Sequence, residues 1–286
     1  MRFQRKFRCD FCASTESKPY LKTTKVSWYG KDRFELHSCV NCNLVMAFPR
    51  PDRDALYKDF FEGADSAQRT ITRKLSRPNV LAVHEKAVER AEGFFKEAND
   101  GRRPKVIFDM GFGAGTLMEA ARLKEMEAEG NEINLAGVHR MQDLGFNAHH
   151  GFTRDLSLEP ERFDMVFNFD YLEHSYEPFQ DLKTCNALLK GNGILYLKTL
   201  YLDCPDHLLK GPNYQLLGQG HFSYFWPRTL LCMFQSAGFE ILELRMTGLI
   251  YIIAKKVGPP LPKISLNFLD HRYAMVEEKT PLEVHH

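Results

Sequence analysis

Four of the seven cysteines form two C-x-x-C pairs, a spacing typical of metal sites. The pairs are Cys9 with Cys12 and Cys39 with Cys42. Two intervening residues let both thiolates of a pair converge on one tetrahedral Zn²⁺, at about 2.3 Å per sulfur. Four sulfur ligands leave no open coordination position, so we expect a zinc that folds the chain and does not activate water. Two reduced or redox-active dithiols are the alternative.

A second group of residues that could bind a ligand lies in the segment 106–116. A buried strand is expected to end near Asp109 and to enter a helix through Gly111, Gly113 and Gly115. Open α/β sheets bind ligands beyond the carboxyl ends of their strands, where glycines admit a close approach and helix N–H groups face the ligand. The G-x-G-x-G pattern suits a nucleotide-like cofactor and differs from the dinucleotide fingerprint G-x-G-x-x-G. A tight strand-to-helix turn without a ligand is the structural alternative.

Alternating strand and helix patterns must position these residues. A helix is expected over 79–98, followed by strands at 105–110, 126–131, 147–150, 164–169 and 194–199 and by helices at 115–123, 135–144, 178–189 and 227–237. This order predicts a parallel sheet with helices on both faces. Segments 239–245 and 249–255 are too close together for a helical crossover, so we expect an antiparallel hairpin at one edge.

Composition limits the classes of protein. The 286 residues are 44% hydrophobic and contain no apolar run close to the roughly 20 residues that span a bilayer. Lys and Arg total 38 against 37 Asp and Glu, which disfavours a nucleic-acid partner and an anionic membrane. Cys185, Cys204 and Cys232 are scattered, so reduced thiols and a cytoplasmic location are expected.

The segment 106–116 resembles the first motif of class I S-adenosylmethionine-dependent methyltransferases. The stretch 130–134 resembles the end of the family's second strand, which implies that Glu132 binds the ribose hydroxyls. The stretch 163–174 is similar to the fourth strand and the loop after it, and His221 to Phe225 resembles a substrate-side segment of the same family. The resemblance covers roughly residues 101–256.

The resemblance implies S-adenosylmethionine as cofactor. The residues implied to bind it are Asp109, Gly111, Gly113, Gly115, Glu132, Phe152, Asp170, Tyr171 and Leu172. At the adenine position, the family's usual Gly-Asp reads Gly151-Phe152. A hydroxyl or acidic-carbon acceptor needs a base within hydrogen-bond reach, and the candidates are His174, His221, Tyr224 and Glu173. As structural alternatives, Glu173 would favour a helix N-terminus and the histidines would be polar packing residues.

The fold class that follows is α/β, with a Rossmann-like, seven-stranded, mostly parallel sheet, an antiparallel edge hairpin and a small N-terminal zinc-ribbon-like module. The expected parts are a zinc module at 1–50, a helical linker at 51–100 with a short helix at 54–61, a methyltransferase domain at 101–258 and a tail at 259–286. The last five residues, 282–286, resemble the remnant of a purification tag.

The function implied by the resemblance is methyl transfer to a small molecule. C-x-x-C pairs followed by Phe48-Pro-Arg-Pro51 also occur in methyltransferases with a zinc-binding N-terminal region, several of which act on nucleotide-linked sugars or other glycan and natural-product intermediates. We therefore expect an acceptor of this kind. Methylation of RNA or protein, and a catalytically silent recognition protein, are the alternatives. The sequence does not predict an oligomeric state.

Overall fold

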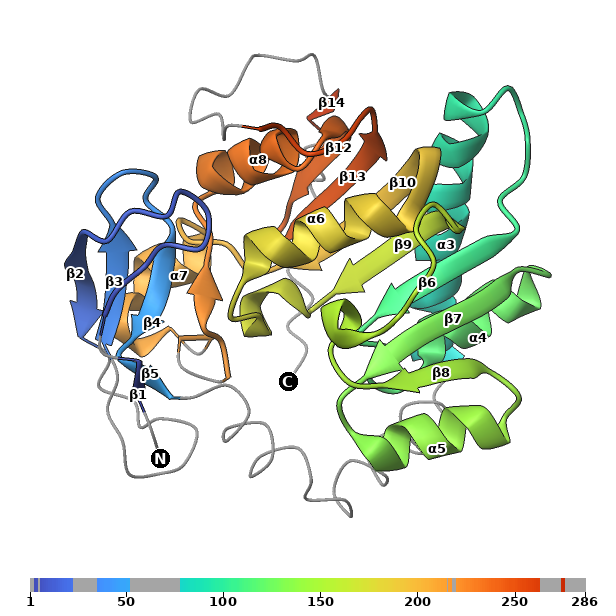
Figure 1. The fold of residues 1–286 in the computed structure, drawn as a ribbon, viewed down its shortest axis with the longest axis horizontal. Coiled ribbons are helices and arrows are strands. Elements are labelled where there is room, and N and C mark those ends of the chain that lie inside the picture. Colours follow the sequence, from blue (N-terminus) through green and yellow to red (C-terminus); the bar gives the residue numbers. More distant parts are fainter. Residues whose placement is uncertain are drawn as a thin grey trace.

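The chain folds around one large sheet flanked by helices, with a small cysteine-containing module beside it (Figure 1). A computed structural model describes residues 3–4, 6–22, 35–51, 78–214, 216–217, 220–262 and 274–275. The helix expected at 54–61 and the final segment 282–286 lie outside the described residues. No described helix is both long enough and apolar enough to cross a membrane.

The large sheet has the strand order β14-β12-β13-β10-β9-β6-β7-β8. The strands from β8 to β10 are parallel, and β13 runs antiparallel to both β10 and β12. This confirms the mostly parallel seven-stranded sheet with an antiparallel hairpin, to which the two-residue strand β14 is added beside β12. The strands are β6 (Val106–Met110), β7 (Glu127–Glu132), β8 (Asn147–His150), β9 (Phe163–Phe169), β10 (Leu189–Thr199), β12 (Phe239–Met246), β13 (Ile250–Lys256) and β14 (Ala274–Met275).

Helices cover both faces of this sheet. The helices are α3 (Pro78–Ala98), α4 (Thr116–Leu123), α5 (Leu135–Asp143), α6 (Pro178–Leu188), α7 (Pro205–Lys210) and α8 (Pro227–Ser236). Apolar residues of α3, α4 and α5 pack with Ile107 and Met165 in one core, whereas α6 and α8 pack with Phe108 and Val166 in the other. Neighbouring residues of a strand point to opposite faces, which explains this alternation. Helix α3 thus packs on the sheet and belongs to one of the two cores that flank it.

One boundary differs from the sequence expectation by more than one residue. Strand β10 begins at Leu189, where helix α6 has just ended, and not at residue 194. The pairing of β10 with β9 shifts register between Leu189 and Ile194. The intervening residues include Gly191, Gly193 and Asn192, and Asn192 has a φ of 58°. This bulge-like stretch breaks the apolar pattern, so the sequence hides the first part of the strand.

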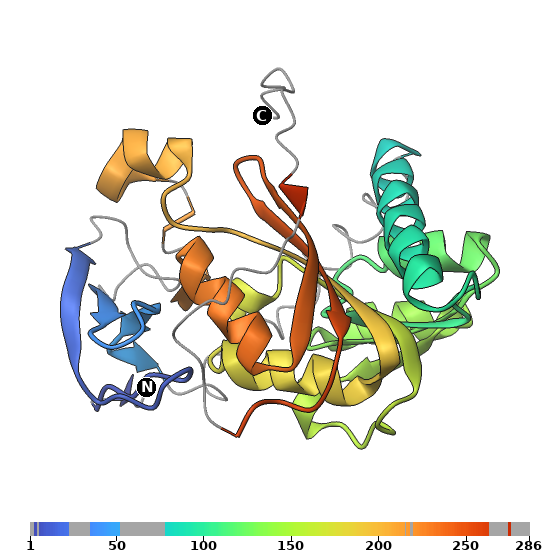
Figure 2. The same ribbon diagram turned by 90° about the horizontal axis from the view of Figure 1, so that it is seen from above.

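The cysteine module shares a sheet with the rest of the chain. Strands β2 (Ser17–Lys22), β3 (Glu35–Cys39) and β4 (Val45–Phe48) form an antiparallel sheet, and β11 (Ser223–Tyr224) pairs with β4 at its edge. Two short strands, β1 (Phe3–Gln4) and β5 (Arg50–Pro51), pair separately. The module lies at one end of the molecule and α3 at the other (Figure 2). The expected small N-terminal module is therefore completed by a strand from residues far downstream.

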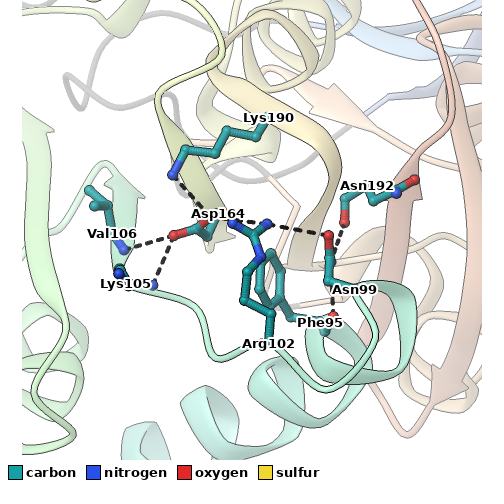
Figure 3. A network of polar contacts seen from close by, with 8 residues as sticks. All are labelled: Phe95, Asn99, Arg102, Lys105, Val106, Asp164, Lys190 and Asn192. Carbon is teal, nitrogen blue, oxygen red and sulfur yellow. Dashed lines mark hydrogen bonds and ion pairs between the residues drawn. The ribbon is translucent and has the colours of Figure 1, made fainter.

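A buried carboxylate aligns the starts of the central strands (Figure 3). One oxygen of Asp164 accepts the backbone N–H groups of Lys105 and Val106, at 2.8 and 3.1 Å. Its other oxygen lies 3.0 Å from the ammonium of Lys190. Asp164 is 1% exposed, so each of these partners replaces water that the carboxylate lost on folding. The network fixes β6, β9 and β10 at the ends that are remote from the cofactor motif.

At the opposite end, β6 and β7 approach each other so closely that one position must be glycine. A Cβ atom built on Gly130 would lie 2.7 Å from the carbonyl oxygen of Asp109 and 3.1 Å from the ring of Phe112. The carbonyl oxygen of Asp109 belongs to the backbone of β6, so it cannot move aside as the end of a flexible side chain can. Any larger residue at position 130 would therefore push β7 away from β6.

We predict that Gly130→Ala lowers the free energy of unfolding by about 1–3 kcal/mol, the usual cost of overpacking. Urea denaturation of parent and variant measures this change. Gly93→Ala is the matched control, because a Cβ at helical Gly93 meets nothing within 4 Å and should raise stability by about 0.5–1 kcal/mol. Equal stability of Gly130→Ala and the parent would contradict the close approach of the two strands.

Candidate active site

A pocket of about 220 Å³ lies at the carboxyl ends of β6, β7 and β9. The chain leaves β6 toward β7 and β8 on one side and later returns to β9 on the other, so the pocket is at the topological switch point, where open α/β sheets bind ligands. Its lining residues are Gly111, Gly113, Asn131, Glu132, Ile133, Phe152, Arg154, Asp170, Tyr171, His174, Ser175, Tyr176 and Asp181. The strands β6 to β9 point toward the cysteine module (Figure 1).

The three glycines of the turn have separate structural reasons. All three have positive φ, of 72° at Gly111, 53° at Gly113 and 74° at Gly115. A Cβ at Gly111 would lie 2.5 Å from the ring of Tyr171, and one at Gly115 would lie 2.3 Å from the sulfur of Met141. A Cβ at Gly113 would meet only a backbone oxygen at 4.0 Å. Gly113 therefore needs to be glycine only for its positive φ, whereas Gly115 also serves helix packing.

Glu132 lies at the end of β7 and lines the pocket. One carboxylate oxygen accepts the N–H of Gly113 at 3.0 Å. The other accepts the N–H groups of Ile133 and Asn134 at 2.8 and 3.0 Å. Burial nevertheless raises the pKa of Glu132. Burial and the neighbouring Glu132 carboxylate also raise the pKa of Asp109, to about 7.

Asn131 was not singled out by the sequence analysis, yet it connects two loops of the pocket, the one after β6 and the one after β8. Its side-chain oxygen accepts the N–H of Gly111 at 3.3 Å and the hydroxyl of Thr153 at 2.7 Å. Its amide group donates to the carbonyl of Gly151 at 2.9 Å. An amide next to the acid at the end of a strand was the only sequence signal for this role.

Of the expected catalytic residues, only His174 lines the pocket. Its Nδ1–H donates to the carbonyl of Gly220 at 2.8 Å, which leaves Nε2 as a hydrogen-bond acceptor. His221 lies behind it, with ring centroids 4.7 Å apart, and donates to the carbonyl of Leu216. Burial lowers the pKa of His174, and burial together with His174 lowers the pKa of His221 to about 4. Both rings are therefore neutral at pH 7.

Glu173 and Tyr224 lie deeper in the structure. The buried carboxylate of Glu173 accepts the hydroxyl of Thr199 at 2.6 Å, and burial and Asp170 raise the pKa of Glu173 to about 7. Tyr224 is fully buried and its hydroxyl donates to the carbonyl of His221 at 3.1 Å. Glu173 and Tyr224 are therefore placed to hold the loops that carry the two histidines.

The other expected cofactor residues divide between the pocket and the core. Phe152, Asp170 and Tyr171 line the pocket, whereas Leu172 is fully buried and packs in the core. Arg154 also lines the pocket and forms an ion pair with Glu177. Sequence reasoning missed Arg154 because nothing in its local pattern distinguishes it from a surface arginine.

The four cysteines of the C-x-x-C pairs meet at one point. Their sulfurs all lie within 4.8 Å of one another, with Cys9 to Cys42 and Cys12 to Cys39 each at 3.4 Å. A tetrahedral zinc with bonds of about 2.3 Å places its sulfurs about 3.8 Å apart, so the cluster fits this metal. A hydrogen bond from Cys42 lowers the pKa of Cys9 to about 6, which favours the thiolate.

The cysteine module contacts the segment that follows the pocket loop. The carboxylate of Asp10, between the two cysteines of the first pair, accepts the N–H of Phe179 at 2.6 Å in the first turn of α6. Glu177, the N-cap residue of this helix, makes no side-chain cap. Arg50 donates to the carbonyl of Tyr176 at 2.7 Å and lies over its ring. The module thus supplies the missing helix cap and supports the pocket loop from outside.

Comparisons with known proteins agree with this geometry. The sequence is 28% identical over 178 residues to a protein of Coxiella burnetii named ubiquinone biosynthesis O-methyltransferase, which covers 58% of this chain and 75% of that protein. It is 29% identical over 160 residues to the protein of the same name in Haemophilus ducreyi, covering 49% of this chain and 67% of that one.

One solved structure has a similar fold with 16% identity and a TM-score of 0.51. It is a 1,6-didemethyltoxoflavin-N1-methyltransferase of Burkholderia thailandensis with bound S-adenosylhomocysteine, and the match covers 77% of this chain and 98% of that one. Residues 83–244, more than half of the chain, match the family described as methyltransferase domain. The chain therefore belongs to this family and is a class I S-adenosylmethionine-dependent methyltransferase.

Proposed function

We propose that the protein transfers the methyl group of S-adenosylmethionine to a hydroxyl group of a small molecule, such as a sugar or another natural-product intermediate. The single observation that carries this proposal is the carboxylate of Glu132 beside the N–H of Gly113 at the switch-point pocket. The names of the curated relatives, which are O-methyltransferases, support an oxygen acceptor.

Each part of this cofactor would have a partner in the pocket or beside it. Glu132 would accept the two ribose hydroxyls, and Phe152 would lie against the adenine. Asp109 and the glycine turn would hold the methionine end. When bound, the sulfonium supplies both the methyl group and its own leaving group. The protein then has to orient the acceptor and exclude water.

His174 is the proposed general base. It is the candidate that lines the pocket, and its Nδ1–H donates to the carbonyl of Gly220, so Nε2 is the ring nitrogen that can accept a proton. A neutral imidazole within hydrogen-bond reach takes the proton of the acceptor hydroxyl as the methyl group is transferred. His221 then packs against His174 and holds its ring in place.

The cysteine cluster is proposed to hold a structural Zn²⁺ that keeps the module folded. All four sulfurs would serve as ligands, so the metal takes no part in the reaction. Through Asp10 and Arg50, the folded module then supports the loop that carries His174.

We predict that Glu132→Gln weakens binding of S-adenosylhomocysteine by roughly 10- to 100-fold. The neutral amide loses charge-assisted hydrogen bonds worth about 1.5–3 kcal/mol and brings N–H groups against that of Gly113. Calorimetric titration measures the affinity. Glu127→Gln is the matched control, because this exposed residue begins the same strand. A parent protein without affinity for S-adenosylhomocysteine would contradict the proposed function.

His174→Gln should lower kcat by about 10²- to 10⁴-fold while leaving the affinity for S-adenosylhomocysteine intact. Since burial lowers the pKa of His174, the rate of the parent should rise with pH only below about 6.5 and then level off. Transfer of labelled methyl to a panel of phenols and sugars measures both effects. His139→Gln, an exposed change on α5, is the control. An unchanged pH profile in His174→Gln would remove its assignment as the base.

Asp10→Ala should weaken S-adenosylhomocysteine binding by roughly fivefold, since loss of a helix cap costs about 1 kcal/mol and this helix follows the pocket loop. Removal of the metal with a chelator should weaken binding at least as much. Calorimetry measures both affinities, and a colorimetric zinc assay verifies that Asp10→Ala keeps its metal. Glu16→Ala, an exposed acid of the same module, is the control. Unchanged affinity after metal removal would show that the module does not support the pocket.

A further inference from the structure

The switch-point pocket is small for the cofactor that it is proposed to hold. Its volume is about 220 Å³. Sites for ligands of drug size usually have roughly 300–1,000 Å³, and S-adenosylmethionine, which joins an adenosine to a methionine, belongs to that size class. The structure therefore has the pocket in a closed form, and part of its lining must move before the cofactor can enter or leave.

One wall of the pocket is fixed to the end of β7. This wall is the segment 151–154, which follows β8. The side chain of Asn131 accepts the hydroxyl of Thr153 at 2.7 Å and donates to the carbonyl of Gly151 at 2.9 Å. The N–H of Gly151 donates to the carbonyl of Glu132 at 3.0 Å. These hydrogen bonds hold the backbone of the wall against β7.

The opposite wall is held from outside the pocket. It is the segment 170–176, between β9 and α6. The hydroxyl of Ser223 in β11 donates to the carbonyl of Ser175 at 3.1 Å. Arg50 of the cysteine module donates to the carbonyl of Tyr176 at 2.7 Å. Because the backbone of each wall is fixed, we expect the pocket to open by the movement of side chains.

An ion pair between Arg154 and Glu177 joins the two walls. Arg154 lines the pocket, whereas Glu177 is the N-cap residue of α6 and lines a separate cavity beside the cysteine module. Their side chains are 19% and 47% exposed, so water reaches the pair and can replace either partner. Asp181, which is buried and lines the pocket, also attracts the guanidinium: burial lowers the pKa of Arg154, but Asp181 and Glu177 raise it overall.

We propose that the ion pair between Arg154 and Glu177 is a gate for the cofactor. Entry and exit both require the pair to break, and the pair forms again over the bound molecule. Because the pair is present in the free and in the bound protein, it sets the rate of exchange and adds little to the affinity. The gate rests on the proposed binding of S-adenosylmethionine in the switch-point pocket.

Exchange of S-adenosylhomocysteine by the full chain tests the gate. A chase of labelled ligand with excess unlabelled ligand gives the dissociation rate, and this rate divided by the dissociation constant from calorimetry gives the association rate. Glu177→Gln should raise both rates about threefold, as expected for the loss of a partly exposed ion pair. Arg154→Gln should raise them about threefold to tenfold, because it also removes the attraction to Asp181. The dissociation constant should stay nearly unchanged in both variants.

Salt should act on the parent as the substitutions do. High ionic strength screens a partly exposed ion pair, so the parent should exchange its ligand faster in high salt, whereas the rates of both variants should change little. Lys255→Gln is the matched control. Lys255 and Glu240 form an ion pair of similar exposure, 25% and 42%, on the edge hairpin beside the start of β10, at the end of the sheet remote from the pocket. This variant should keep the rates and the salt dependence of the parent.

Equal exchange rates in the parent and in both gate variants, or rates in the parent that do not depend on salt, would overturn the gate. A weaker affinity of Arg154→Gln with an unchanged association rate would also overturn it, in favour of a direct contact between Arg154 and the cofactor. If the parent does not bind S-adenosylhomocysteine, the proposed function and the gate both fail. If the parent binds it and the substitutions leave the rates unchanged, the gate alone fails.

Discussion

The pairing of β11 with β4 is the contact on which the arrangement of the site depends. It joins residues near 45 to residues near 224, and so makes one sheet from two distant parts of the chain. His221 precedes this strand and Trp226 follows it, so the pairing fixes the positions of both. Asp10 and Arg50 reach the pocket loop from the same module. The module thus supports the pocket loop from outside.

The two ends of the central strands have different tasks. At their amino ends, the carboxylate of Asp164 binds backbone N–H groups of β6 and the ammonium of Lys190 in β10. These contacts hold the strands in place relative to one another. At their carboxyl ends, the glycine turn, Asn131 and Glu132 line a pocket. The turns at the pocket are held in turn by Asn131 and Glu132, which accept backbone N–H groups of Gly111 and Gly113.

Much of this architecture could be predicted from the sequence because its signals are local. The strand–glycine–helix segment predicted β6 and α4, the alternation of strands and helices predicted a mostly parallel sheet, and spacing alone predicted the cysteine cluster. The residues that were missed act over long sequence distances. Asp10 caps a helix that begins 168 residues later, and Arg50 meets Tyr176, so no local pattern could indicate either. The same reason hid β11, a two-residue strand that exists only because β4 lies beside it.

Because the cysteine module and the methyltransferase domain share a sheet, separating them would expose a strand edge. If the chain were divided between β5 and α3, the larger piece would keep its full parallel sheet but would leave β11 without its partner. An unpaired strand offers free N–H and C=O groups to any neighbouring chain. Apolar surface around Tyr224 and Phe225 would be uncovered with it. Such a fragment would tend to self-associate, so the two parts are best produced together as a single translation product.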